Sequence, residues 1–309
     1  MDPAQLGRCI FFAIFVSMKR LLLTLILGAC VGTGFAQETA LPSPDAQSLG
    51  MGGLAMTTVG ASHTLYHNVA MSAFSDSPLQ LSSSFYKRDN SDFYSVTGAL
   101  AFGQQNRLHA GWRQYLHGKG SSDMAVDAGF SRRIGRHWGV GVVGRYLHLR
   151  RPDANADALA VDLSAAWSHP LEQLGRYATL RVGAKAANLG GYLKTGGYEL
   201  PVSATAGVAL DTFLSDAHEI TVGVDMGYCF APSAAKGGYG SVGAEYNLMQ
   251  LVQLRAGYHY GENSRYSPSY AAVGGGVRFL HLRFDFAYLF AAQSSLLHNT
   301  YSFSFGLDF

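Results

Sequence analysis

The chain has 309 residues, of which 48% are apolar and only 14% charged, with a formal net charge of +2 at pH 7. It is too apolar for an intrinsically disordered protein, and its mean hydropathy of +0.07 is too low for a bundle of membrane-spanning helices. The charge forms no basic cluster, so no nucleic-acid partner is expected. The 37 glycines, 17 tyrosines and 18 phenylalanines favour strands.

Residues 1–36 have the layout of an export signal. The basic pair Lys19 and Arg20 precedes the apolar stretch LLLTLILGACVG, and the small residues GFA follow it. This pattern predicts a signal peptide that is cleaved after Ala36. A helical anchor that is never removed is the alternative.

Two further features of the leader leave alternatives open. Met18 stands directly before the basic pair, so residues 1–17 are either an upstream start extension or part of the leader. The sequence LGAC resembles a lipoprotein cleavage box, which would leave a lipid on Cys30. Otherwise Cys9 and Cys30 are removed with the leader and Cys229 remains alone, so no intrachain disulfide is expected.

Residues 37–78 mix small and apolar residues without a two-residue period. A segment of this length ahead of a barrel either hangs in the periplasm or folds into the lumen, and we predict an N-terminal luminal plug, or hatch. Gly50, Gly52 and Gly53 would let its backbone pack closely inside a narrow pore. An ordinary turn is the alternative for this glycine cluster.

Residues 79–309 alternate between apolar and polar positions in segments of about ten to twelve residues, the length of a tilted strand that crosses a bilayer. About fourteen segments are present, at 79–89, 92–102, 107–117, 122–133, 138–150, 157–168, 177–187, 201–212, 218–230, 238–247, 250–261, 269–279, 281–291 and 299–309. An even number returns both chain ends to one side, as bacterial outer-membrane barrels require. The sequence therefore predicts an all-β fold, a transmembrane antiparallel β-barrel that is integral to the bacterial outer membrane.

The connections between these segments alternate in length. GQQN, GRH, LSDA and LHL are short, whereas RPDANAD, LGGYLKTGGYELP, APSAAKGG, GENSRYSPS and QSSLLHN are longer. Short turns are typical of the periplasmic side and long loops of the outside. Two links depart from this pattern, because the first outward loop is very short and the inward link HPLEQLGRY is long.

The two faces of the strands are predicted from the last one, YSFSFGLDF. Its lipid-facing, barrel-insertion side is Tyr301, Phe303, Phe305, Leu307 and Phe309. A charge on the lipid face costs about 2–4 kcal/mol at mid-depth, so charged side chains should share the other face. The same alternation turns these residues toward the lumen: Arg107, Arg113, Asp127, Arg145, Asp162, Arg181, Lys185, Asp225, Glu245, Arg255, Arg283 and Asp285.

The inward charges of both signs allow two interpretations. They form a hydrogen-bonded, packed interior in which opposite signs relieve each other, or they line a polar conduit. A soluble β-sandwich would also alternate, but so many long aromatic strands with charges on the opposite face are unusual for that class.

The segment DAQSLGMGG followed by YHNVAMSAF resembles the N-terminal hatch of the FadL-like porins and their PorV/PorQ relatives, in which A-x-x-x-G-M-G-G-A precedes N-P-A-x-L-A. The matching hatch residues are Leu49, Gly50, Met51, Gly52, Gly53, Asn68 and Ala70. Val69 and Met71 depart from the pattern, since the family prefers proline and leucine there. The segments AANLGG, ELP, GAEYNLMQLVQLRAGYHYG, LRFDFAYLF and NTYSFSFGLDF also resemble the PorV-type branch, so the resemblance covers nearly the whole mature chain.

This resemblance implies fourteen strands with a plug and gives two hypotheses for function. The first is the predicted function, in which the protein is a non-enzymatic partner or scaffold in an outer-membrane secretion or assembly complex, as in type IX secretion. It is favoured because the outward loops are short for capturing a substrate and the strongest motif matches are to the PorV-type branch. In the second, the protein is a FadL-like channel for a hydrophobic small molecule. The expected partners are outer-membrane lipid, the barrel-assembly machinery, other outer-membrane proteins and a hydrophobic ligand, without a cofactor.

The histidines do not indicate a reaction. His63 and His67 have the i, i+4 spacing of a metal pair on a helix, but the glutamate of an HExxH motif is missing and the sequence indicates no third ligand, so no metal site is expected. His109, His148, His259 and His281 lie on predicted strands without a nucleophile that the sequence could place beside them. No catalytic residue is predicted, and an acyl hydrolase or acyltransferase is only an alternative.

The tyrosines of the long loops and a glycine triplet are two further features of the sequence. The tyrosines of the long loops, Tyr192, Tyr198 and Tyr266, either anchor a partner protein or belong to an interfacial girdle or loop packing. Gly274, Gly275 and Gly276 lie within a predicted strand with no helix after it, which excludes a phosphate-binding loop.

Overall fold

The computed structural model describes residues 35–36, 45–88, 91–117, 120–152, 155–171, 176–193, 198–263, 266–295 and 297–309. The predicted signal peptide up to residue 34, the Cys30 lipid box and the start of the plug at 37–44 lie outside these residues. The short strand β1 (Phe35–Ala36) pairs in parallel with β9 (Tyr198–Glu199). Among the described residues no helix has the length and apolar character needed to cross a membrane.

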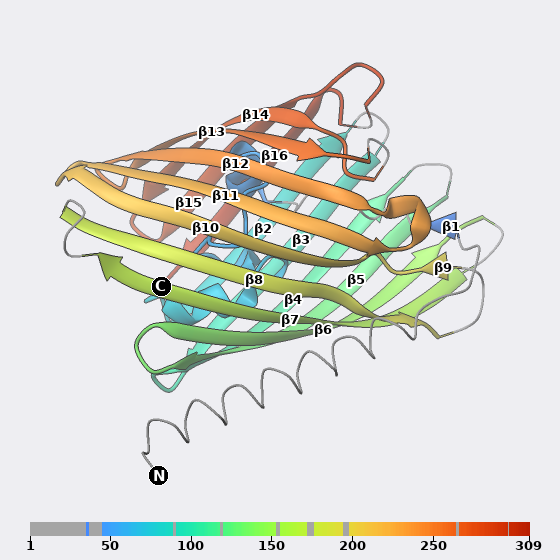
Figure 1. Cartoon of the computed structure of the whole chain (residues 1–309), viewed down its shortest axis with the longest axis horizontal. Helices are drawn as coiled ribbons and strands as arrows, with labels where there is room; N and C mark the ends of the chain where they lie inside the picture. The colour runs from blue at the N-terminus through green and yellow to red at the C-terminus, as the bar shows by residue number, and fades with distance from the viewer. Residues whose placement is uncertain are drawn as a thin grey trace, which may run out of the picture. The chain divides into compact units, whose positions relative to one another are not determined.

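Fourteen antiparallel strands close into one barrel, which confirms the predicted fold class (Figure 1). They are β2 (Leu79–Arg88), β3 (Ser91–Phe102), β4 (Asn106–Leu116), β5 (Ser122–Ile134), β6 (Trp138–Arg150), β7 (Asn155–Leu171), β8 (Arg176–Tyr192), β10 (Val202–Ser215), β11 (His218–Ala231), β12 (Gly237–Leu248), β13 (Val252–Gly261), β14 (Tyr270–Phe279), β15 (Leu282–Phe290) and β16 (Thr300–Asp308). Neighbours in sequence pair with each other, β8 pairs with β10, and β16 closes on β2. This architecture is that of integral bacterial outer-membrane proteins.

The link between β7 and β8 differs from the prediction, because most of HPLEQLGRY continues the strands. Both strands have 17 residues, and Pro170 pairs with Thr179 and Leu171 with Ala178. Proline cannot donate a ladder hydrogen bond, so within sheets it is confined to edges, strand ends and bulges. On the side of β7 that faces β6, the pairing ends at Trp167, which lies opposite Trp138, the first residue of β6. Pro170 lies beyond this end, so no β6 residue needs a hydrogen bond from its backbone nitrogen.

The other end of β8 passes a bulge before it reaches Tyr192. The register with β7 shifts between Val161 and Leu163, and Asn188 has φ +59°. The side chain of Asp162 accepts a hydrogen bond from the Asn188 N–H at 2.7 Å, which satisfies the backbone at this break. The strand therefore extends beyond its predicted end at residue 187.

The outer face of the barrel is apolar. The rings of Phe305 in β16 and of Phe309 directly after it are exposed, whereas Ser302 and Ser304 are buried. Tyr301, Phe303 and Leu307, on the same side as the exposed rings, are half-buried beside neighbouring side chains. Other exposed apolar residues on this face are Val96, Leu108, Val126, Val142, Leu159, Leu163, Val208, Val224, Val242, Leu254, Val273, Val277 and Phe284.

The barrel encloses the segment 45–78, called the plug below, which contains three short helical turns (Figure 1). They are α2 (Ala46–Gly50), η1 (Ser62–Leu65) and η2 (Val69–Phe74). Leu49 and Leu65 are fully buried, and α2 contacts β13, β14, β15 and β16. A fourth short turn, η3 (Ser233–Ala235), lies between β11 and β12.

We expect Val242→Arg to destabilise the barrel by about 2–4 kcal/mol, because Val242 is 49% exposed on the outer face near the middle of β12. Phe230→Arg is the matched control, because this exposed residue lies near the end of β11, where the cost falls to about 0–1 kcal/mol. The measurement is reversible urea unfolding in lipid vesicles. Equal effects at the two positions would contradict a lipid-facing outer surface.

Candidate functional site

The plug begins with a capped helical turn. Asp45 is the N-cap of α2, and its carboxylate accepts a hydrogen bond at 2.7 Å from the Ser48 N–H, which otherwise has no partner within the helical turn. The chain then turns at Gly52 and Gly53, whose φ values of +70° and +82° favour glycine. A Cβ atom on Gly52 would lie 2.4 Å from the backbone nitrogen of Tyr258, so this turn lies directly against β13.

Glycines of the wall face the backbone of the plug. A Cβ on Gly243 would lie 2.2 Å from the Met51 carbonyl oxygen, and one on Gly257 would lie 2.1 Å from the Met51 carbonyl carbon. Gly50 and Gly274 meet in the same way, since a Cβ on Gly50 would lie 3.0 Å from the Gly274 Cα. Backbone therefore packs against backbone without intervening side chains. This contact explains why glycines occur within the wall strands here.

Asn68 joins three parts of the structure. Its side-chain oxygen accepts from the Ala70 N–H at 3.2 Å and caps η2. Its Nδ2 donates to the Met56 carbonyl at 2.9 Å and to the Ala165 carbonyl of β7 at 3.2 Å. The Ala70 N–H also donates to the Ser164 Oγ at 3.2 Å. Asn68 and Ala70 thus connect η2, the middle of the plug and the wall.

Asp225 is the main acidic anchor of the plug. It is buried on β11, and its Oδ2 accepts from the N–H groups of Ala55 at 2.7 Å and Met56 at 3.0 Å. Cationic wall residues bind plug carbonyls: Lys185 binds Tyr66 at 2.9 Å, Arg283 binds Gly60 at 3.1 Å, and Arg107 binds Ser75 at 2.7 Å and Ser77 at 2.5 Å. The plug backbone therefore pairs with inward-facing charges of the wall.

The remaining inward charges form ion pairs with one another. Arg145 binds Asp127 at 2.6 Å and Asp162 at 3.0 Å, and Lys185 also contacts Asp162 at 2.9 Å. Arg113 lies 3.3 Å from Asp127. This cluster connects β4 to β8 through neighbouring strands, so it fills one side of the lumen with paired charge.

A second ion-paired cluster lies on the opposite part of the wall. Arg255 binds Glu245 at 2.5 Å and Asp285 at 2.7 Å, and the Arg283 Nε lies 3.4 Å from Asp285. Arg181 forms a separate pair with Asp211. The predicted inward residues thus lie in paired groups, which favours the packed-interior interpretation over a continuous polar conduit.

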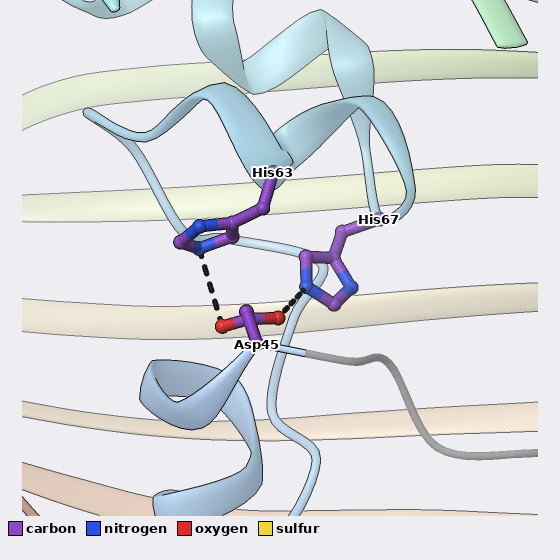
Figure 2. Close-up of side chains that lie close together, drawn as sticks. All are labelled: Asp45, His63 and His67. Atoms are coloured by element: carbon purple, nitrogen blue, oxygen red, sulfur yellow. Dashed lines mark hydrogen bonds and ion pairs between the residues drawn. The ribbon is translucent and has the colours of Figure 1, made fainter. Parts of the chain in front are cut away.

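The two plug histidines meet a common acid (Figure 2). The Nε2 atom of His67 lies 2.5 Å from Asp45 Oδ2, and that of His63 lies 3.2 Å from Asp45 Oδ1. Burial lowers the pKa of His63 to about 3, so this imidazole is neutral at pH 7. Burial alone would raise the pKa of Asp45, but the imidazoles and the hydrogen bonds from His67 and Ser48 hold it well below its usual value.

The sequence did not indicate this third partner. Asp45 is 22 residues from His67, and its local role as a helix cap gives no sign of the histidines. The spacing of His63 and His67 suggested one helix, whereas the structure places His63 in η1 and His67 beyond its end. Only the fold of the plug brings the three side chains together.

A cavity of about 340 Å³ lies above the plug, at the end of the barrel that carries the long connections. Plug residues of its lining are Gly53, Met56, Tyr66 and His67. Its apolar lining includes Phe93, Tyr115, Ala125, Leu147, Leu200, Cys229, Tyr266, Tyr270 and Leu297, and its polar lining includes Arg113, Asp123, Arg145, Lys185 and His259. The sequence pattern placed Arg113, Arg145 and Lys185 on inward faces but did not predict that the side chains leave a space.

The fold is similar to that of several solved transporters. The toluene transporter TbuX of Ralstonia pickettii matches with a TM-score of 0.56 at 12% identity, over 90% of this chain and 99% of TbuX. The toluene transporter TodX of Pseudomonas putida matches with a TM-score of 0.56 at 14% identity, over 86% of this chain and 96% of TodX. A FadL homologue of Pseudomonas aeruginosa matches with a TM-score of 0.51 at 12% identity, over 90% of this chain and 99% of the homologue.

These similarities establish a shared fold over nearly the full length of each solved chain. No protein-family model matches the chain, and no curated protein matches its sequence. The observed fold therefore agrees with the fold that the FadL-like resemblance of the sequence implies.

We expect Asp225→Ala to loosen the plug, because two buried N–H groups lose their acceptor, at a cost of about 1–3 kcal/mol each. Residues 45–78 contain no lysine or arginine, so chymotrypsin is the protease to use. Cleavage within the plug should be at least about tenfold faster than in the wild type.

Asp211→Ala is the matched control, because the Asp211 side chain binds Arg181 and Thr221 of the wall. It should leave cleavage of the plug near the wild-type rate. Equal rates for both variants would show that Asp225 does not hold the plug.

Proposed function

We propose that the protein is a non-enzymatic channel of the outer membrane for a small hydrophobic molecule. The observation that carries this proposal is the cavity of about 340 Å³ above the plug, with its largely apolar and aromatic wall. An apolar cavity of about 150 Å³ is large enough for benzene, so this one has room for a monoaromatic molecule. Ligand sites typically combine such a wall with a few placed polar groups.

The charges around the cavity do not oppose an apolar ligand, because they are paired within the wall. Arg145 and Lys185 both bind Asp162, and Asp123 binds Arg151 at 2.5 Å. Each of these charged groups therefore has a partner of opposite sign before a ligand enters. The aromatic residues Phe93, Tyr115, Tyr266 and Tyr270 offer ring faces and edges to the same space.

Passage through the barrel requires the floor of the cavity to move. Gly53 and Met56 belong to this floor, and the Met56 N–H is bound to Asp225. Hydrogen bonds, and not covalent links, hold this part of the plug to β11. We propose that local displacement of the segment between Gly53 and Gly60 opens the route.

The conductance of the Asp225→Ala variant in planar bilayers should then exceed that of the wild type.

The solved structures with a similar fold agree with this proposal. TbuX and TodX are toluene transporters, and a TodX variant is a monoaromatic hydrocarbon channel. These substrates are those of the other proteins. They support a hydrophobic small molecule as the class of ligand here.

A scaffold role of the PorV/PorQ type is the second hypothesis, and the sequence motifs alone carry it. Of the loop tyrosines proposed as anchors for a partner, Tyr266 is buried beside Cys229 and Ala235 and faces the cavity. It is therefore not exposed for docking. Crosslinking in mild detergent followed by mass spectrometry would support the scaffold hypothesis if stoichiometric protein neighbours were found.

Filling the cavity tests the channel directly. Ala125 is 3% exposed and lines the cavity, whereas Val126, the next residue of β5, is 46% exposed on the outer face. We expect Ala125→Trp to reduce toluene binding and uptake by at least about tenfold, because the indole occupies the ligand space. Val126→Trp adds the same ring toward lipid and should preserve both.

Binding is measured by saturation-transfer NMR on the purified barrel, and uptake is measured with radiolabelled toluene in cells that express each variant. Absence of binding to the wild type, for toluene and for longer hydrocarbon or fatty-acid probes alike, would overturn the channel proposal. The same result together with specific protein neighbours would favour the scaffold.

A further inference from the structure

We propose that Asp45, His63 and His67 form a binding site for a divalent transition-metal ion, with zinc as the best match. One oxygen or nitrogen atom from each side chain lies within 4.8 Å of the other two. Figure 2 shows both imidazoles directed at the same carboxylate. All three residues are buried inside the plug, so the cluster is not a chance grouping of surface side chains.

The state of His63 is a second and independent observation. The side chain is 3% exposed, yet neither ring nitrogen has a hydrogen-bond partner among the residues that the structure describes. Its Nε2 lies 3.2 Å from Asp45 Oδ1, but the geometry is not that of a hydrogen bond. A buried polar atom without a partner is unfavourable and uncommon. A metal ion between the imidazole and the carboxylate would satisfy this nitrogen.

The ligand set selects the class of ion. Imidazole nitrogens suit zinc and its transition-metal neighbours, whereas calcium and magnesium need a larger set of oxygen ligands. Zinc binds nitrogen and oxygen at about 2.0–2.2 Å, which separates tetrahedral ligands by roughly 3.3 Å. The spacing of His63 and Asp45 already fits this value, and His67 would move from 2.5 Å by less than about 1 Å.

The carboxylate is held in place for this role. Ser48 donates to Asp45 through its N–H at 2.7 Å and through its Oγ at 2.6 Å. Such outer contacts fix the direction of a ligand before the metal binds. The nearby guanidinium of Arg283 is paired with Asp285 at 3.4 Å and Asp308 at 3.7 Å, so its charge is largely neutralised.

His67 also gives the site an entry path and a free coordination position. It lines the cavity, so an ion and its remaining water can arrive from that side. Three protein ligands and one open position are the usual set of a zinc site that is not closed. Bound metal would join the start of α2 to the chain after η1, across 22 residues of the plug. The proposal is independent of the channel function.

The test uses the full, folded barrel in detergent, without an affinity tag. After treatment with EDTA, the protein is titrated with Co²⁺, and bound Co²⁺ is then displaced with Zn²⁺. We expect one equivalent of metal, with the intense visible absorption of a four-coordinate cobalt site. X-ray absorption of the zinc form should show two imidazole ligands and further oxygen ligands.

The variants separate this site from others. Asp45→Asn keeps a residue that can cap α2, and together with His63→Gln it should weaken metal binding by at least about 100-fold. His137→Ala is the matched control, because the Nδ1 atoms of His137 and His169 form another close pair at 3.4 Å on the wall. This control should bind metal as the wild type does.

Several results would overturn the proposal. One is a wild-type protein that takes up no cobalt or zinc at micromolar concentrations, and another is binding that His137→Ala abolishes while Asp45→Asn retains it. A zinc spectrum without imidazole ligands would also exclude the site, whether or not the variants fold. Heat-modifiable migration in gels shows that each variant is a folded barrel before it is titrated.

Discussion

Closure of the barrel between β16 and β2 is the constraint on which the other features depend, because hydrocarbon offers no partner to the hydrogen-bonding groups of a free strand edge. The terminal residue takes part, since the Phe309 N–H donates to the Leu79 carbonyl at 2.9 Å. A strand in a closed wall has only two environments, lipid outside and the lumen inside. The alternation of side chains therefore sorts apolar residues outward and polar residues inward along the whole chain. The last strand ends on aromatic residues because it is as much a part of the lipid face as any other.

Closure of the barrel also places polar groups inside the lumen, and the plug provides hydrogen-bond partners for some of them. A lumen lined by inward charges and polar groups needs partners for them, and ion pairs between strands supply only some. The plug supplies others through its backbone, as its carbonyls accept from Lys185, Arg283 and Arg107 and its N–H groups donate to Asp225. Wall glycines let this backbone approach closely, so the middle of the lumen is filled by peptide groups. Toward the end with the long connections, apolar side chains surround the cavity.

The sequence predicted the wall well because its signal is local and has a period of two residues. The prediction of strand ends was wrong at Pro170. Its place in β7 depends on where the neighbouring strand β6 begins, which the residues around Pro170 do not show. The sites were harder to predict because they depend on contacts between distant segments. Nothing near Asp45 indicates that His67 will bind it, and no periodicity shows that the inward side chains of Ala125 and Leu147 leave a cavity. Asp225 was placed in the lumen by its alternation, but its role as a plug anchor needed the fold of Ala55 and Met56.

The two proposals concern different parts of the same segment, and together they suggest how a plug can be both fixed and movable. The Asp45–His67 contact joins the two ends of a loop whose middle contains the cavity floor. Within that loop, Gly60 has φ +83°, which favours glycine, and its carbonyl accepts a hydrogen bond from Arg283 at 3.1 Å, while among the described residues no atom lies within 4 Å of the position a Cβ would take. A metal ion at the base would restrict motion of the flanking turns, while the stretch between Gly53 and Gly60 is held by its hydrogen bonds to Asp225 and Asn68 and by the buried side chain of Leu54. Under the channel proposal, displacement of that short stretch would join the cavity to the rest of the lumen without unfolding the whole plug.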